Sequence, residues 1–386
     1  MNFVGKYSIL IVFIFLGFVS KAQQDSAKKK LINIQLKNDS NVLFQNKKLN
    51  IDDNSNEPKL EIGAYLSSYY AFYSEDNTTD YVKHPTMAAR NNEFGLNMVM
   101  VSLGYRSKKV RSNITLHYGD IAESTWPTKF NMIQEANAGV ELFKNLWLDA
   151  GVFRSHIGLE STQPRENITS SMTLANVYEP YFFSGAKLTY LINSKLSLQL
   201  NTFNSFNSIV ETNKNKLIGS SVVFAPNENL SMTYNFITGD DTRDTIELKH
   251  QRYYHNFYLT YQKNKVSIGA EFNYGIQEYS KRINTTTVST AYMNSSLVLF
   301  KHQTFKKVGF YGRGEWFSDE DEILSTGSNM GKYTWGATVG IEYKPVKNMA
   351  LSVEGRQLNS EKENFYYNGK YRKERNEFIF CLDVWF

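Results

Sequence analysis

Charged and polar side chains recur at alternate positions along much of this chain, and that spacing limits the chemistry they can perform. In residues 110–118, Arg111 shares its parity with Asn113 and His117, whereas Ile114 and Leu116 take the other parity. An extended strand sends alternate side chains to opposite faces, so one face of this segment is polar and the other apolar. Charges held on a polar face next to confined water set a local field, which orients dipolar solutes and biases the choice of ions.

The same parity argument identifies charged residues on the polar face of many other segments, together with His117 and Asp383. These candidates are Arg111, Glu135, Glu141, Asp149, Lys187, Glu271, Arg313, Glu315, Glu342, Glu354 and Arg356. With Asp383 included, acids outnumber bases eight to four, which predicts a mild preference for cations. Mutual ion pairs that support a wall are the alternative role for the same side chains.

Catalytic and metal-binding patterns are not indicated. The chain contains neither G-x-S-x-G nor H-E-x-x-H, its six histidines lack metal-ligand spacing, and its one cysteine, Cys381, takes the polar parity of the last segment. Two acidic stretches, 240–244 and 318–322, offer oxygen ligands, but neither has the spacing of an EF-hand loop, so a solvated loop surface is favoured. We therefore expect no catalytic residue, no metal and no cofactor.

The elements that position these residues are predicted to be strands. Period-2 alternation recurs from Leu60 onward in sixteen segments. Segments 94–105, 217–225 and 288–302 alternate poorly, so fourteen or eighteen strands are alternatives. The sixteen segments are 60–73, 94–105, 110–118, 133–143, 146–154, 182–192, 195–205, 217–225, 229–238, 251–262, 265–276, 288–302, 306–317, 332–343, 348–357 and 376–386.

The connections between these segments alternate strictly between short and long. Turns such as 144–145 and 263–264 are followed by long loops such as 155–181 and 358–375. A barrel that crosses an outer membrane sorts its connections in this way, with short periplasmic turns and long external loops. The fold class predicted is therefore an all-β, transmembrane, antiparallel up-and-down barrel; a secreted β-sandwich or propeller is the soluble alternative.

The composition agrees with a barrel in which only the outward face is apolar. The 386 residues are 41% hydrophobic and carry a net charge of +5, yet they include 26 Phe and 25 Tyr. The near-neutral balance argues against a nucleic-acid partner, which requires a concentrated basic face.

The two ends of the chain carry separate signals. Residues 1–22 have the basic start, apolar centre and Ser-Lys-Ala end of a secretory signal peptide, and the polar residues 23–57 are expected to form a periplasmic segment before a barrel at 58–386. At the C-terminus, an apolar stripe of alternate residues ends at Phe386. This stripe resembles the terminal-strand signature that outer-membrane barrels present to their assembly machinery.

Residues 133–190 carry a more specific pattern. It comprises Glu135-Ala136, Leu148-Asp149-Ala150-Gly151-Val152-Phe153, Ile157-Gly158-Leu159-Glu160-Ser161, Asn167, Ser170-Ser171, Pro180 and Gly185. The pattern resembles the putative beta-barrel porin family of Gram-negative outer membranes. That resemblance implies a channel for small hydrophilic solutes, in contact with outer-membrane lipid and lipopolysaccharide; a homotrimer is an alternative to a monomer.

In general porins of this strand number, the third external loop folds inward and narrows the pore. By this resemblance, loop 155–181 is the constriction loop, with Arg154, His156, Glu160, Arg165 and Glu166 as the candidate residues. One alternative is a substrate-specific channel with aromatic side chains stacked in the lumen, namely Tyr65, Tyr69, Tyr254, Tyr258 and Tyr311. Another is a non-conducting barrel that acts as an adhesin or assembly partner through loops 155–181 and 358–375.

Overall fold

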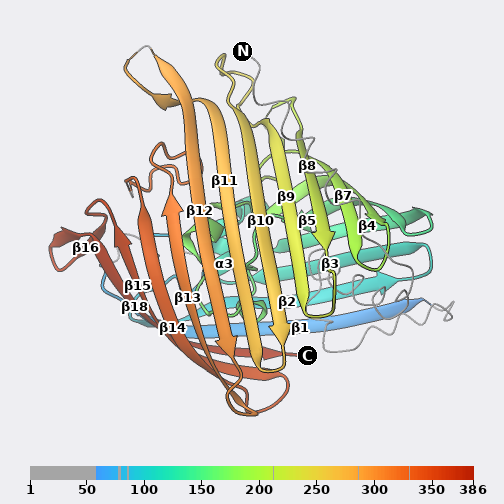
Figure 1. The fold of residues 1–386 in the computed structure, drawn as a ribbon, viewed down its shortest axis with the longest axis horizontal. Coiled ribbons are helices and arrows are strands. Elements are labelled where there is room, and N and C mark those ends of the chain that lie inside the picture. The colour runs from blue at the N-terminus through green and yellow to red at the C-terminus, as the bar shows by residue number, and fades with distance from the viewer. Residues whose placement is uncertain (1–57, 77–79, 85–86, 212, 286, 330) are drawn as a thin grey trace.

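The structure is a computed structural model that describes residues 58–76, 80–84, 87–211, 213–285, 287–329 and 331–386. The predicted signal peptide 1–22 and polar segment 23–57 lie outside the described residues. In the described part of the chain, sixteen strands form one closed antiparallel barrel (Figure 1). They are β1 (Lys59–Tyr73), β2 (Glu93–Arg106), β3 (Val110–Tyr118), β4 (Ile133–Phe143), β5 (Leu146–Arg154), β6 (Phe182–Leu191), β7 (Leu196–Phe203), β8 (Leu217–Phe224), β9 (Leu230–Asp240), β10 (Gln251–Lys263), β11 (Val266–Arg282), β12 (Val288–His302), β13 (Val308–Ser318), β14 (Thr334–Tyr343), β15 (Met349–Ser360) and β18 (Glu374–Trp385). The predicted fold class and the count of sixteen are confirmed.

The barrel closes between its first and last strands. β1 pairs with β2 on one side and with β18 on the other, where Tyr65 lies opposite Trp385. Each other strand pairs with its neighbours in the sequence, except that β15 pairs with β18 across a small separate sheet. Closure leaves no strand edge unpaired, which a sheet in hydrocarbon requires because lipid cannot hydrogen-bond to the backbone.

Side-chain alternation sorts each strand into an outer and an inner face, and β14 shows it clearly. Trp335, Val339 and Tyr343 are 41%, 70% and 42% exposed, whereas Thr338 on the other parity is 2% exposed. The apolar side chains therefore face outward, where lipid replaces water, and the polar ones face the interior.

The three segments that alternate poorly are all strands, and the structure explains why their pattern is weak. In β2, a bulge places Met98 opposite Ser67 and Leu96 opposite Ser68, so Asn97 is an extra residue and the parity changes there. In β8 and β12, apolar residues such as Leu217 and Met293 face inward and belong to an internal hydrophobic cluster. Apolar residues on both faces remove the alternation from the sequence.

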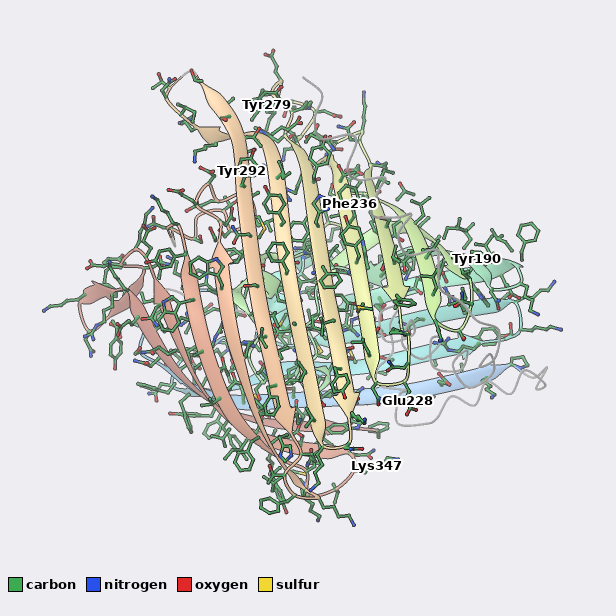
Figure 2. The ribbon with its side chains drawn as sticks, viewed as in Figure 1. Tyr190, Glu228, Phe236, Tyr279, Tyr292 and Lys347 are labelled. Carbon is green, nitrogen blue, oxygen red and sulfur yellow. The ribbon has the colours of Figure 1, made fainter. Side chains whose placement is uncertain are left out.

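The length of the connections distinguishes the two ends of the barrel, because the short turns lie at one end and the long loops at the other. Figure 2 shows Glu228 and Lys347, which belong to short turns, at the opposite end from Tyr279 in the extended tip of β11. That tip continues to Arg282, beyond the predicted end at residue 276. The long loops contain α3 (Asp120–Thr125), η3 (Thr128–Phe130), η4 (Pro164–Glu166), α4 (Leu174–Tyr178) and the hairpin of β16 (Phe365–Tyr367) and β17 (Lys370–Arg372), none of which the alternation predicts. No helix in the described ranges is long and apolar enough to span a membrane.

Candidate functional site

Loop 155–181 lies inside the barrel and reaches the wall opposite its origin. The loop leaves β5 and returns at β6, and its base is closed by a hydrogen bond of 3.0 Å from Ser155 N to Tyr181 O. Its backbone N–H groups donate to side chains of the distant strands: Leu159 N to Glu271 on β11 at 2.6 Å, and Ser170 N to Glu354 on β15 at 2.7 Å. β13, halfway around the ring of strands from β5, also contacts the loop. The loop therefore crosses the lumen.

The strongest anchor of the loop is Arg313 on β13, whose side chain is 0% exposed. Its Nη1 donates to Glu160 Oε1 at 3.0 Å, to Thr169 Oγ1 at 2.8 Å and to the Ser171 carbonyl at 2.6 Å. Glu160 Oε2 in turn accepts from Thr173 N at 2.7 Å. One guanidinium group and one carboxylate thus connect both halves of the loop to the wall.

This pair begins a chain of alternating charges along the inner wall, which we call the charge ladder. Successive ion-pair distances along it are 3.0, 3.3, 2.6, 3.4, 2.6 and 2.7 Å. Its members, in order, are Glu160, Arg313, Glu315, Arg356, Glu377, Arg375 and Glu75. The ladder connects the third external loop to the first. Arg375 and Glu377 were not among the residues predicted from the sequence, although both share the parity of Asp383 on the same strand.

A buried carboxyl pair lies at the other end of the loop. Glu179 Oε1 accepts a hydrogen bond of 2.7 Å from the Tyr254 hydroxyl. Burial, and then the neighbouring Glu271 carboxylate, raise the pKa of the Glu179 carboxyl well above its ordinary value. The loop is consequently packed best when Glu179 is protonated.

The remaining constriction candidates occupy different environments. Arg154 and Glu166 form an ion pair of 2.8 Å within the loop and its base. His156 packs in the apolar cluster, with its ring centroid 5.6 Å from that of Phe183. Arg165 lies against the rings of Tyr65 and Trp385. Of the five candidates, Glu160 forms the ion pair with the wall.

The wall candidates fall on the inner face, in two groups. Glu271, Arg313, Glu315 and Glu354 contact the loop directly; Glu315 accepts from Leu174 N at 2.9 Å. The other wall candidates contact partners outside the loop, and Arg356 belongs to the charge ladder. The partners are Asp149 for Arg111, Asn113 for Glu135, the Asn145 N–H for Glu141, the Phe153 ring for Lys187, and Lys301 and Lys344 for Glu342.

The inward tyrosines are buried. Tyr65 donates to Asp383 at 2.6 Å, Tyr69 donates to Asp120 at 2.5 Å, and Tyr311 shares a contact of 3.3 Å with Ser170 Oγ. Tyr254 holds Glu179, and Tyr258 is also buried. The hydroxyls of Tyr65, Tyr69, Tyr254 and Tyr311 thus contact polar partners on strands and loops.

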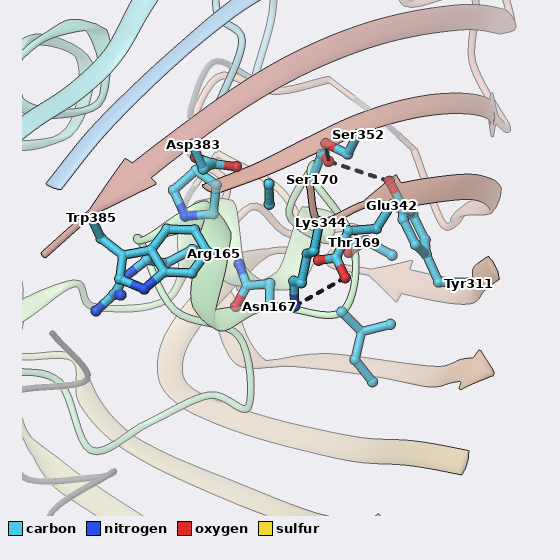
Figure 3. Close-up of a pocket in the computed structure, with 13 residues that line it drawn as sticks. Arg165, Asn167, Thr169, Ser170, Tyr311, Glu342, Lys344, Ser352, Asp383 and Trp385 are labelled. Atoms are coloured by element: carbon cyan, nitrogen blue, oxygen red, sulfur yellow. Dashed lines mark hydrogen bonds and ion pairs between the residues drawn. The ribbon is translucent and has the colours of Figure 1, made fainter. Parts of the chain in front are cut away.

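Residues of the loop line two of the cavities in the described part of the structure. The first, about 180 Å³ in volume, is lined by Arg165, Ser170, Lys344 and Trp385 toward the short turns (Figure 3). The second, about 340 Å³, is lined by His84, Tyr178 and Ser328 from the long external loops. Different parts of the loop thus line the two cavities.

The acidic stretches organise loops. Asp319 accepts hydrogen bonds from Ile323 N and Leu324 N, both at 2.9 Å, and Asp240 accepts one from Thr242 N at 2.9 Å. Among the residues that the structure describes, no group of three or more His, Cys, Asp or Glu side chains is placed to hold a metal ion.

Comparison with solved structures identifies the fold. An anion-selective porin from Comamonas acidovorans superposes with a TM-score of 0.58 at 9% identity, over 86% of this chain and 100% of that one. OmpT of Vibrio cholerae gives 0.55 at 11% identity, and OmpF of Salmonella typhi, in complex with daunomycin, gives 0.55 at 13%; each covers 85% of this chain and 98% of the other. At these identities the likeness shows a porin fold and no more.

Comparison by sequence identifies the family. No curated protein sequence matches the chain. A family model described as putative beta-barrel porin-2, OmpL-like, matches residues 59–386, which include every strand of the barrel. The predicted porin resemblance is confirmed, and the chain belongs to the putative beta-barrel porin-2, OmpL-like family.

Proposed function

We propose that this protein is a porin whose water-filled lumen passes small hydrophilic solutes and ions by passive diffusion, with loop 155–181 as the constriction. Membership of the family implies a location in the outer membrane. The observation that carries the proposal is the anchoring of the loop to the wall opposite its origin, by Arg313 with Glu160 and by Glu354 with Ser170. A barrel of this size leaves a lumen, and the loop reduces it.

Selection in such a channel rests on size and on charge. Solutes pass between the loop and the wall, and the fixed charges orient them in the narrow space without cofactor or energy coupling. Arg111 and Arg356 neutralise Asp149 and Glu315, whereas Glu354 and Asp383 accept hydrogen bonds from neutral groups. A mild cation preference follows from the acids without a basic partner.

The partners we propose belong to the membrane. The apolar outer face contacts lipid, the long loops contact lipopolysaccharide, and Phe386 presents the terminal signal to the assembly machinery. OmpT of Vibrio cholerae has a trimer form, and we propose a homotrimer for this chain as well.

Liposome swelling tests the proposal. Liposomes that contain the purified, refolded protein should swell in isotonic arabinose or glycine, and more slowly in larger sugars. Liposomes without protein provide the baseline. No swelling in any small solute, together with zero conductance in planar bilayers, would refute a channel; intact binding of a partner would then favour the adhesin or assembly role.

A substrate-specific channel is the second candidate, and the packing of the loop favours it. Thr169, Ser171 and Thr173 are each about 2–3% exposed, and they belong to the loop that lines the cavities of about 180 and 340 Å³. Swelling rates that follow solute size indicate a general porin. A solute that enters faster than smaller ones indicates a specific channel.

A further inference from the structure

The cavity of about 180 Å³ on the short-turn side of the loop has the chemistry of a binding site. At about 30 Å³ per water molecule, it has room for a solute the size of roughly six waters. Figure 3 shows Arg165 lying along Trp385 at one end, with Lys344, Glu342 and Tyr311 at the other.

Three nitrogen atoms at the Arg165 end are donors that lack acceptors among the described residues. Arg165 Nε and Nη2 and the indole Nε1 of Trp385 are buried, and none has a hydrogen-bond partner within the described residues. Three arginines elsewhere on the inner face differ, because Arg111, Arg313 and Arg356 each contact a carboxylate. Buried donors without acceptors are costly, so a ligand that supplies oxygen atoms gains free energy there.

Two aromatic rings hold the Arg165 guanidinium in place without neutralising its charge. Its Cζ lies 5.4 Å from the centroid of the Tyr65 ring and 5.3 Å from that of the Trp385 ring. Such stacking fixes the plane of the group, and its Nε and Nη2 edge has no hydrogen-bond partner within the described residues.

The acids that line the same cavity are already engaged. Asp383 accepts the Tyr65 hydroxyl at 2.6 Å, and Glu342 pairs with Lys301 at 2.7 Å and with Lys344 at 3.0 Å. The protein therefore offers Arg165 no carboxylate within ion-pair distance in its described part.

We propose that this cavity binds the carboxylate group of a small solute, through the Nε and Nη2 edge of Arg165 and the indole N–H of Trp385. The two N–H groups of that edge match the two oxygens of a carboxylate. Hydroxyl groups of Ser170 and Ser352 lie farther along the cavity for the rest of the solute. The two Arg165 nitrogens and the indole nitrogen of Trp385 are all covered by protein, so binding includes a small shift of both side chains toward the cavity. The inference rests on the proposed channel and names the solute class that the channel recognises.

The test uses propionate, with propionamide as a neutral isostere, on the whole refolded protein in planar bilayers. Propionate should reduce the potassium chloride conductance of the wild type in a concentration-dependent way, more strongly from the short-turn side. Propionamide should not. Inorganic phosphate that reduces the conductance as strongly would overturn the assignment to a carboxylate.

Three variants and a control localise the effect. Arg165→Gln should raise the half-blocking concentration about tenfold or more, because a charge-assisted bidentate pair is lost. Arg165→Lys keeps the charge but loses the planar edge, so it should also weaken the block. Trp385→Phe keeps the ring, loses the N–H and should have an intermediate effect. Arg282→Gln, the same change at the exposed tip of β11, should leave the block unchanged.

The outcomes separate this inference from the channel proposal. A conducting wild type whose propionate block survives in Arg165→Gln overturns the site and leaves the porin in place. A wild type that does not conduct refutes the channel. Calorimetric titration of propionate into the barrel in detergent then still decides the site: binding lost in Arg165→Gln supports it, and no binding overturns it.

Discussion

Replacing Arg313 with glutamine should release loop 155–181 and increase the conductance. The guanidinium group makes hydrogen bonds of 3.0, 2.8 and 2.6 Å to three residues of the loop, with its side chain fully buried. The substitution leaves the Glu160 carboxylate buried without its counter-charge. Removal of one partner from a buried ion pair costs about 3–5 kcal/mol.

That cost acts on the loop more than on the barrel. The strand ladders remain intact, and the loop keeps its contacts with Glu354 and with Glu315. At about 1.4 kcal/mol per factor of ten, the population of loops that have left the wall should rise by roughly 10²-fold to 4 × 10³-fold. Single-channel recordings in planar bilayers should show a larger mean conductance and more frequent large openings.

Arg252→Gln is the matched control. Arg252 is also an inner-face arginine, but it contacts Gln277 at 2.6 Å and the Ile323 carbonyl at 2.9 Å, not loop 155–181. In the double variant Arg313→Gln with Glu160→Gln, part of the change should be reversed because no unpaired charge remains. Equal conductance in wild type, Arg313→Gln and Arg252→Gln would refute the reasoning.

Three further predictions concern the loop, the barrel wall and the C-terminus. The pKa of Glu179 is raised above its usual 4.5, so the loop packing that it supports is present at low pH and is lost as pH rises through the raised pKa. Bilayer conductance should therefore rise with pH above about 4.5, and Glu179→Gln should flatten the profile. A wild type whose conductance does not change with pH would contradict this. Gly151→Ala should destabilise the barrel by about 1–3 kcal/mol, because φ is +132° there and a Cβ would lie 2.2 Å from Ala136 O. In the control variant Gly355→Ala, the new Cβ meets no atom within 4 Å. The temperature at which the folded band disappears from a gel should therefore fall for Gly151→Ala alone. Phe386→Ala should lower the amount of protein in outer-membrane fractions. Because the Phe386 side chain is 72% exposed, the temperature at which the folded band disappears should not change. An equal loss of protein for Phe378→Ala would argue against a terminal signal.

The strands could be predicted from the sequence because the alternation that identifies each strand lies within the strand itself. Lipid on one side and polar surroundings on the other impose period 2, so the predicted bounds of β3, β4, β5 and β12 agree with the structure. The predicted strand bounds were wrong where a strand extends beyond the lipid on one side or the polar interior on the other. The tip of β11 beyond residue 276 follows a register shift between Gln277 and Lys281 and includes Tyr279 with φ +53°, so its alternation does not continue.

The site was less predictable because its contacts are long-range. Parity places Arg313 on the inner face, but its partner Glu160 is 153 residues away on a loop without periodicity. Nothing local specifies which wall position meets which loop residue. The orphaned donors of Arg165 and Trp385 were similarly hidden, since an unpaired group is recognised only when all its neighbours are known.

The acidic excess of the inner wall has a second cause beyond ion selection. A loop that enters a barrel carries backbone N–H groups that lose contact with bulk water and need acceptors. Glu271, Glu315 and Glu354 supply them, to Leu159, Leu174 and Ser170. Carboxylates suit this task because they accept several hydrogen bonds and have no donors of their own. A count of wall acids against wall bases therefore mixes two roles, since part of that negative charge also holds the loop. A charged group without a carboxylate partner, such as Arg165, then influences the selection of solutes more strongly than a count of charges suggests.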